Sequence, residues 1–259
     1  MIDIGVNLTE EQFQGKELAV LQRAKEAAIQ KMILTGSSVG GSKRSLEMAK
    51  RHPGILYSTA GVHPHDAKSY TEQSTKDLKQ LLAQPEVIAI GECGLDFDRN
   101  YSEPADQYYA FEAQLQIAEE IDLPIFLHER AAHKEFLQVM KQHERLIEKS
   151  VVHCFTGDKE QLKAYLDAGF YIGVTGWVCD MKRGMDLREA LAYMPLNRLM
   201  IETDAPYLLP KNLKPKPKSR INEPMYLPHI GREIAALMQV EEHHFFETVQ
   251  KNTEKFFRL

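Results

Sequence analysis

Short runs of apolar and β-branched residues recur along the chain, and each is followed by a polar or glycine-containing turn and then a stretch with helical spacing. Runs of this kind, bounded by turns, predict buried strands. Eight strands are predicted, at Ile2–Val6, Lys31–Thr35, Leu56–Ala60, Val87–Gly91, Pro124–Leu127, Ser150–Val152, Tyr171–Val174 and Leu199–Ile201.

The stretches between these runs are amphipathic, and residues 104–121 show the pattern best, with Ala, Leu and Ile near one face and Glu and Gln near another. Alternating strands and helices predict parallel strands joined by crossovers. Eight such units at about 30 residues each make a (β/α)8 TIM barrel. A doubly wound open sheet is the alternative, but no G-x-G-x-x-G sequence follows the first run to favour it.

The length of 259 residues suits a single barrel, although length alone also fits two domains. No linker divides the chain. Its one low-complexity segment, PKNLKPKPKSR at residues 210–220, follows the last predicted strand rather than separating two similar halves. We therefore predict one domain over residues 1–259.

Composition narrows the class of protein. With 43% hydrophobic residues the chain can bury a core without disulfide bonds, and its three cysteines lack C-x-x-C spacing. No stretch approaches the roughly 18 to 20 apolar residues that span a bilayer, and the first residues do not resemble a signal peptide. We predict a monomer in the cytoplasm.

The charge balance argues against one function class. Lys and Arg number 32 against 37 Asp and Glu, a formal net charge of −5, whereas a general nucleic-acid coat needs an excess of cations. A local basic patch remains compatible with this balance.

Polar side chains stand at the ends of several predicted strands, where barrel enzymes carry their active sites. A single strand-end histidine is usually structural, but these residues form a set, and their oxygen and nitrogen donors suit Mg²⁺, Mn²⁺ or Zn²⁺. Such a site can activate water, so hydrolysis is the predicted reaction. The set comprises Asn7, His63, His65, Glu92, His128, His153 and Asp204.

Strand alternation supports the direction of two of these side chains. His128 shares the parity of Phe126, and His153 that of Val151, so both are predicted to face the barrel axis. Cys93 and Cys154 each follow a candidate ligand, and their parity turns them away, so both are predicted to pack rather than react.

Several motifs together resemble the TatD family of metal-dependent deoxyribonucleases. They are DIGVNL, GVHPH, AIGECGLD, FLHER, VVHCFTG, IETDAPYLLP and RINEP, in family order from residue 2 to beyond residue 224. The resemblance implies an amidohydrolase-like TIM barrel holding one or two divalent ions, with Mg²⁺ expected first and Mn²⁺ or Zn²⁺ as alternatives. It also implies 3′ to 5′ exonuclease activity on single-stranded DNA, with RNA as a second substrate.

Carried over motif by motif, the resemblance implies a role for each residue. Glu92, His128 and His153 would bind metal, with Glu92 bridging a second ion. Asp204 would orient or deprotonate the attacking water and could also contact metal. His63 and His65 would contact the scissile phosphate.

Two motifs depart from the family pattern. Many relatives begin D-x-H-x-H, but here Gly5 and Asn7 replace both histidines. Asn7 offers only an amide oxygen, so a second ion should bind weakly or with help from substrate oxygens, beside which we place Asn7. Ala131 stands where an acidic residue often follows H-x-R, so Arg130, a candidate phosphate ligand, lacks that partner.

A basic segment follows the last strand. Pro215 and Pro217 are predicted to keep it extended, so that it could bind a phosphate backbone or simply be a solvated loop. Aromatic residues after three strands, Tyr207, Trp177 and Phe155, could stack on bases or pack in the core. The basic residues are Lys211, Lys214, Lys216, Lys218 and Arg220.

The same metal chemistry would serve a second class of enzyme, an amide or ester hydrolase acting on a substrate such as an aminoacyl linkage. A small neutral amide would not require the basic segment, which favours the nuclease. A binding protein without activity would be expected to lose ligands on several strands, whereas the loss here is confined to the first.

Overall fold

The computed structural model describes all residues from 1 to 259, and every predicted strand is present. Three strands end elsewhere than predicted: β2 stops one residue early, while β4 and β5 run on through the residues expected to follow them. The strands are β1 (Ile2–Val6), β2 (Lys31–Leu34), β3 (Leu56–Ala60), β4 (Val87–Asp96), β5 (Ile125–Arg130), β6 (Ser150–Val152), β7 (Tyr171–Val174) and β8 (Leu199–Ile201).

Helices alternate with the strands, and the helix predicted over residues 104–121 is α4. The helices are α1 (Glu17–Glu26), α2 (Val39–Arg51), α3 (Glu72–Leu82), α4 (Pro104–Glu120), α5 (His133–Met140), α6 (Glu144–Ile147), α7 (Lys159–Ala168), α8 (Met185–Ala190), α9 (Leu227–Met238) and α10 (Glu242–Phe257). Strand order in the sheet follows chain order, from β1 to β8. None of the helices has both the length and the apolar character needed to cross a membrane.

The chain forms two compact units, a central unit of residues 34–153 and a terminal unit of residues 1–33 and 154–259. The prediction of one domain over residues 1–259 stays a prediction, and each unit is described by itself.

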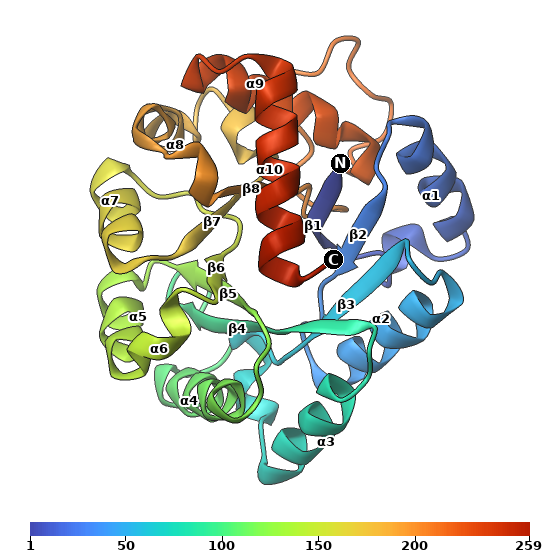
Figure 1. Ribbon diagram of the computed structural model, residues 1–259. Coiled ribbons are helices and arrows are strands. Elements are labelled where there is room, and N and C mark those ends of the chain that lie inside the picture. Colours follow the sequence, from blue (N-terminus) through green and yellow to red (C-terminus); the bar gives the residue numbers. More distant parts are fainter. The chain divides into compact units, whose positions relative to one another are not determined.

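The central unit contains parallel pairs of β3 with β4, β4 with β5, and β5 with β6. Its helices α2 to α6 lie outside these strands, as Figure 1 shows in blue to yellow-green. The core between helices and strands is aromatic and aliphatic. Phe111 of α4 stacks on Phe136 of α5 at 5.6 Å, and both are fully buried.

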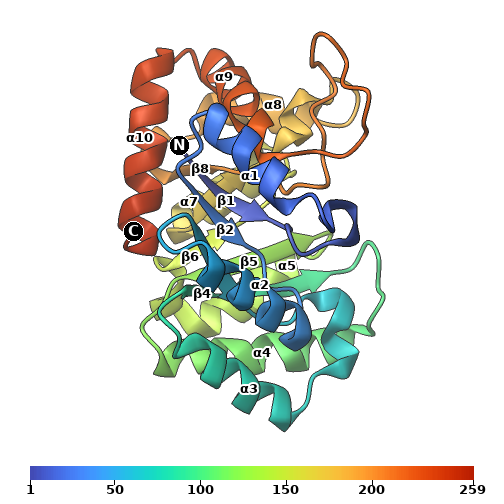
Figure 2. The ribbon, with the colours of Figure 1, turned by 90° about the vertical axis from the view of Figure 1, so that its right-hand side faces the viewer.

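The terminal unit contains the parallel pair of β7 with β8, and a further parallel bridge joins Val6, the last residue of β1, to Ala205, which follows β8. Helix α10 packs against β8 and β1. Figure 2 shows α10 on one side of these strands and the long loop after β8, in orange, on the other. This loop carries the basic segment.

Candidate functional site

Glu92 lies inside β4, not after it as the sequence predicted. The pairing register of β4 with β5 shifts between Ile90 and Cys93, and such a bulge redirects the side chains within it. Glycines flank the bulge because the backbone of β5 is close. A Cβ on Gly91 would lie 2.1 Å from the carbonyl oxygen of Phe126, and one on Gly94 would lie 1.9 Å from that of His128. The glycines of GECG thus allow the bulge that directs Glu92.

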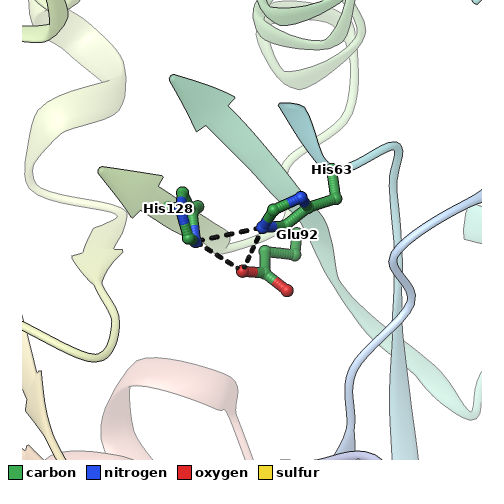
Figure 3. Close-up of side chains that lie close together, drawn as sticks. All are labelled: His63, Glu92 and His128. Atoms are coloured by element: carbon green, nitrogen blue, oxygen red, sulfur yellow. Dashed lines mark hydrogen bonds and ion pairs between the residues drawn. The ribbon is translucent and has the colours of Figure 1, made fainter. Parts of the chain in front are cut away.

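Three imidazoles of the central unit converge on one carboxylate oxygen, Glu92 Oε1. His153 Nε2 lies 2.7 Å from it, His128 Nδ1 2.8 Å, and His63 Nε2 3.3 Å. Figure 3 shows the side chains of His63, His128 and Glu92 pointing toward one another; His63 comes from the turn after β3, His128 from β5 and Glu92 from β4. The structure therefore brings together four of the predicted site residues.

Burial and charge set the protonation of this cluster. Burial alone would raise the pKa of Glu92, but His63, His153 and the hydrogen bonds of His128 and His153 hold that pKa well below its usual range. Desolvation lowers the pKa of His63 to about 4. Glu92 is thus an anion and His63 a neutral ring near pH 7.

The hydrogen bonds of His63 fix which of its nitrogens carries the proton. Its Nδ1 accepts the backbone N–H of His65 at 3.0 Å. A neutral imidazole has one donor and one acceptor nitrogen, so Nε2 carries the proton and donates toward Glu92. This tautomer makes His63 a hydrogen-bond donor toward Glu92. Its Nε2 stays a candidate ligand atom, as do His128 Nδ1 and His153 Nε2, which face the same carboxylate oxygen.

The candidate ligand atoms of this cluster suit a divalent cation. His63, Glu92 and His128 have candidate ligand atoms within 4.8 Å of one another, and His153 Nε2 reaches the same carboxylate oxygen. Glu92, His128 and His153 can supply one oxygen and two nitrogens, a donor set that Zn²⁺ and Mn²⁺ accept and Mg²⁺ tolerates with water, and His63 Nε2 is a further candidate nitrogen. The motifs implied Glu92, His128 and His153 as ligands, and that assignment stays a prediction.

Sequence reasoning missed Asp96. It is almost fully buried, and its Oδ2 lies 2.6 Å from His65 Nε2 and 3.5 Å from His128 Nε2. Burial would raise its pKa, but hydrogen bonds from His128 and His65 lower it, so it is an anion. A carboxylate behind a metal-binding histidine orients the ring. Its shared parity with Glu92 could have revealed it, had the strand been extended past Gly91.

Gln114 of α4 was also missed, and no motif marks it. Its side chain is fully buried and clamps the backbone of Val62 on both sides. Its Oε1 accepts the Val62 N–H at 2.7 Å, and its Nε2 donates to the Val62 carbonyl at 3.1 Å. The GVHPH turn is thereby held against the helix, which positions His63 and His65.

Arg130 has an acidic partner after all. Its Nε lies 3.9 Å from Asp98 Oδ2, so a residue beyond β4 replaces the acid that Ala131 does not supply. Both side chains are more than a third exposed, and the pair is weak. Arg130 thus lacks the partner at position 131, as the sequence indicated, but pairs with Asp98 instead.

In the terminal unit, Asp204 follows β8 with a φ of +52°. Its backbone N–H donates to the carbonyl of Gly5 at 2.9 Å, and Asn7 Nδ2 donates to its Oδ1 at 2.9 Å. The first strand therefore holds both the backbone and the carboxylate of Asp204. Asn7 directs its amide nitrogen at this carboxylate, a contact that the sequence did not predict.

Asp3, the first residue of DIGVNL, is fully buried. Its Oδ2 accepts from the Thr203 hydroxyl at 2.6 Å and its Oδ1 from the Thr203 N–H at 2.9 Å. Burial raises the pKa of Asp3 to about 8 despite these hydrogen bonds. Its role is to fix the residue before Asp204.

The basic segment borders a cavity of about 780 Å³ in the terminal unit. Lys211, Lys216 and Arg220 line it, together with Tyr207 and Trp177. The exposed Lys214 and Lys218 are not among its lining residues. Phe155 is 4% exposed and packs edge-to-face on Tyr165, so for Phe155 the core alternative is right.

The cysteines are all free, and Cys93 is fully buried. Burial, and then the charge of Glu92, raise the pKa of its thiol. A protonated, enclosed thiol is a poor nucleophile, which agrees with the packing role predicted for Cys93.

Comparison with known proteins gives a consistent result. A family model described as "TatD related DNase" matches residues 2–258. A protein of Edwardsiella piscicida named 3′-5′ ssDNA/RNA exonuclease TatD is 48% identical over 100% of both chains. One of the same name from Salmonella typhimurium is 52% identical over 91% of this chain and 90% of its own.

Solved structures agree. A TatD homologue from Escherichia coli superposes with a TM-score of 0.90 and 29% identity, over 100% of this chain and 98% of its own. A hydrolase of the TatD family from Entamoeba histolytica gives 0.89 and 28%, over 99% and 97%. Together with the strand order, this likeness confirms the predicted (β/α)8 TIM barrel.

Proposed function

The chain belongs to the family of TatD-related DNases, and we propose that it removes nucleotides successively from the 3′ end of single-stranded DNA, and of RNA, with Mg²⁺ bound. As a member of this family it is a nuclease, a hydrolase acting on nucleic acids. The convergence of His63, His128 and His153 on Glu92 Oε1 is the observation that carries the proposal.

Glu92, His128 and His153 would hold the ion. When bound, it would lower the pKa of a water and polarise the phosphoryl oxygen. Asp96 keeps the His128 ring in place from its Nε2 side. The anionic character of Glu92 and the low-dielectric surroundings strengthen cation binding, since both ligand charge and burial increase the attraction.

The neighbouring histidines would handle the phosphate. His63 presents an N–H at Nε2, and His65, with a side chain 33% exposed, is the most accessible imidazole of the cluster. Both would donate to non-bridging phosphate oxygens as charge develops on them. The motif around Asp204 assigns it the proton lost by the attacking water, and Asn7 would hold that carboxylate. Arg130 and the cavity-lining Lys211, Lys216 and Arg220 would support substrate binding.

The proposals for the metal, the cellular compartment and the substrate class rest on the chemistry of the residues present. Mg²⁺ is proposed because phosphate oxygens complete its preferred oxygen ligation. Three free cysteines suit the reducing cytoplasm, where we place a monomeric enzyme. The cationic lining of the cavity favours a nucleic acid over the small amide or ester of the alternative hydrolase.

An end-labelled oligonucleotide tests the proposal. A single strand labelled at its 5′ end, incubated with Mg²⁺, should give a ladder that shortens stepwise, and a 3′-labelled strand should release labelled mononucleotide at once. EDTA should abolish both. Glu92→Gln should lower the rate by more than about 100-fold, because loss of a ligand exceeds the 10- to 100-fold effect of an outer partner.

The matched control is Glu47→Gln, which removes a carboxylate that is 66% exposed, and it should cleave at the wild-type rate. Circular dichroism would show that both variants fold. Persistent cleavage in EDTA, or hydrolysis of an aminoacyl ester but of neither DNA nor RNA, would contradict the proposed function.

A further inference from the structure

The cavity in the terminal unit lies between the loop after β7 and the loop after β8. Its walls include Trp177 and Arg183 from the first loop and Tyr207, Lys216 and Arg220 from the second. We call this cavity the Tyr207 groove. Its volume of about 780 Å³ falls within the roughly 300–1,000 Å³ of sites for small organic ligands.

Close packing of the two loops builds the groove. A Cβ on Gly176 would lie 2.4 Å from the carbonyl oxygen of Leu208 and 3.3 Å from Pro210. Only glycine allows this approach without displacing backbone. The next residue, Trp177, therefore stands directly beside the loop that carries Tyr207, so that both line one cavity.

The groove has an excess of positive charge. Four cationic side chains line it, from Arg183, Lys211, Lys216 and Arg220, against the single carboxylate of Asp180. Asp180 is already paired, since its Oδ2 accepts from Arg183 Nε at 2.8 Å. The three remaining cations have no carboxylate in the groove to neutralise them, so the groove suits an anion with more than one charge.

Aromatic surface accompanies this charge. Tyr207 is 47% exposed, a large fraction for an aromatic side chain that lines a cavity. The Trp177 ring carries the Arg183 guanidinium on one face, 4.4 Å from its centroid. Exposed rings beside cations are the features with which proteins bind single-stranded nucleic acids, because bases stack on rings while cations follow phosphates.

We propose that the Tyr207 groove is a nucleotide-binding subsite for single-stranded nucleic acid, in which a base stacks on Tyr207 while Lys216 and Arg220 bind the adjoining phosphates. The proposal rests on the proposed function and adds a binding position to it. A single strand fits better than a duplex, because paired and stacked bases do not expose a face to a tyrosine ring.

Binding in EDTA tests the subsite apart from cleavage. The affinity of the full-length protein for a fluorescein-labelled dT oligonucleotide would be measured by anisotropy. Tyr207→Ala should weaken binding about tenfold, within the range for loss of one stacked base. Tyr207→Phe should bind like wild type. For an abasic strand with the same phosphates, Tyr207→Ala and wild type should bind equally.

Two double variants, each of which removes two positive charges, distinguish binding in the groove from nonspecific binding by a solvated basic loop. Lys216→Ala with Arg220→Ala should weaken binding about tenfold and reduce the slope of log K against log salt by about 1.4, near 0.7 per lost phosphate contact. Lys214→Ala with Lys218→Ala removes the same charge from the same segment outside the groove lining. It should weaken binding by less than about threefold.

Equal losses in the two double variants, or wild-type affinity in Tyr207→Ala, would overturn the subsite. Failure of the proposed function is separate: the wild-type enzyme would then release no nucleotides with Mg²⁺, whatever its affinity in EDTA. Binding that responds to Tyr207 without any cleavage would keep the subsite and reject the nuclease.

Discussion

Asp204 is held in place by contacts from the first strand of the same unit. Its φ of +52° is uncommon for a residue with a side chain, and the hydrogen bonds to Gly5 and from Asn7 stabilise this conformation. Because Asn7 Nδ2 donates to the carboxylate, it favours the anion and fixes its direction. Asn7, one residue after β1, is therefore a positioning residue for Asp204.

Asn7→Ala should lower kcat about tenfold with little change in KM. A hydrogen bond to a charged group contributes about 1.5–3 kcal/mol, and each 1.4 kcal/mol corresponds to a factor of ten. Asn7→Asp should be slower still, because it places a second carboxylate about 3 Å from Asp204. Steady-state kinetics on a single-stranded oligonucleotide would measure both. A rise in KM at unchanged kcat would instead make Asn7 a substrate contact.

The sequence predicted the residue types of the candidate site better than it predicted the residues that contact and position them. Glu92, His128 and His153 were found because carboxylate and imidazole at strand ends have few other common uses together. Gln114 was not predicted, because a glutamine on a helix face belongs to no sequence motif that marks a functional residue. Its importance comes from the backbone of Val62 lying opposite, a contact across 52 residues.

At the scale of elements, a histidine joins α4 to the segment that follows α5. His143 is 7% exposed, with Nδ1 2.7 Å from Glu119 Oε1 and Nε2 2.8 Å from Glu112 Oε1. Both ring nitrogens face carboxylates, so the doubly protonated ring satisfies both. Burial acts to lower the pKa of His143, but the hydrogen bonds to Glu119 and Glu112 outweigh it and raise that pKa.

This pair of contacts should make stability depend on pH. A raised pKa in the folded state gives stabilisation that is complete below the unfolded value of about 6.5 and is lost as pH rises through the folded value. Because Glu112 and Glu119 are 40% and 52% exposed, solvent screening limits the effect to about 1 kcal/mol. Urea unfolding should show that, between pH 6 and pH 9, the free energy of unfolding falls by about 1 kcal/mol more in wild type than in His143→Gln.

Glu112→Gln combined with Glu119→Gln provides the partner test. It should remove the same pH dependence while keeping the imidazole and the shape of both side chains. If His143→Gln retains the full wild-type difference between pH 6 and pH 9, another group is responsible.

Strand ends show where the sequence pattern stops being informative. The run Val87–Gly91 predicted the start of β4 but not its continuation to Asp96. Glycines at 91 and 94 interrupt the β-branched pattern, although both residues lie within the strand. Their small size is required by β5, whose backbone occupies the space of a Cβ. The requirement for glycine at these positions comes from β5, which is distant in the sequence, and it cannot be read from the residues around Gly91 and Gly94.

At the scale of the molecule, binding of metal should be visible in thermal stability. A ligand at one hundred times its Kd stabilises the folded state by about 2.7 kcal/mol, which for a chain of this size raises Tm by about 5–10 °C. Calorimetry with Mn²⁺ or Mg²⁺ against EDTA should show this rise in wild type and in Glu47→Gln. Glu92→Gln should lose most of it. An undiminished rise in Glu92→Gln would place the ion elsewhere.

The net charge of −5 describes the molecule only on average. The carboxylates Glu92 and Asp96 face histidines in the central unit, while the groove of the terminal unit has four cations and one paired carboxylate. A protein whose average charge argues against binding nucleic acid can therefore still present a surface suited to it.

Local patterns in the sequence were enough to predict the eight strands, their alternation with helices, the barrel and the residue types of the candidate metal site, because period, turn residues and motifs are local properties of the chain. Three features became visible only in the folded chain: Asp96 lies behind His65 and His128, Asn7 holds Asp204, and Lys216 lines a cavity while Lys214 does not. Each of these depends on a distance between atoms far apart in the chain, and no local pattern specifies such a distance.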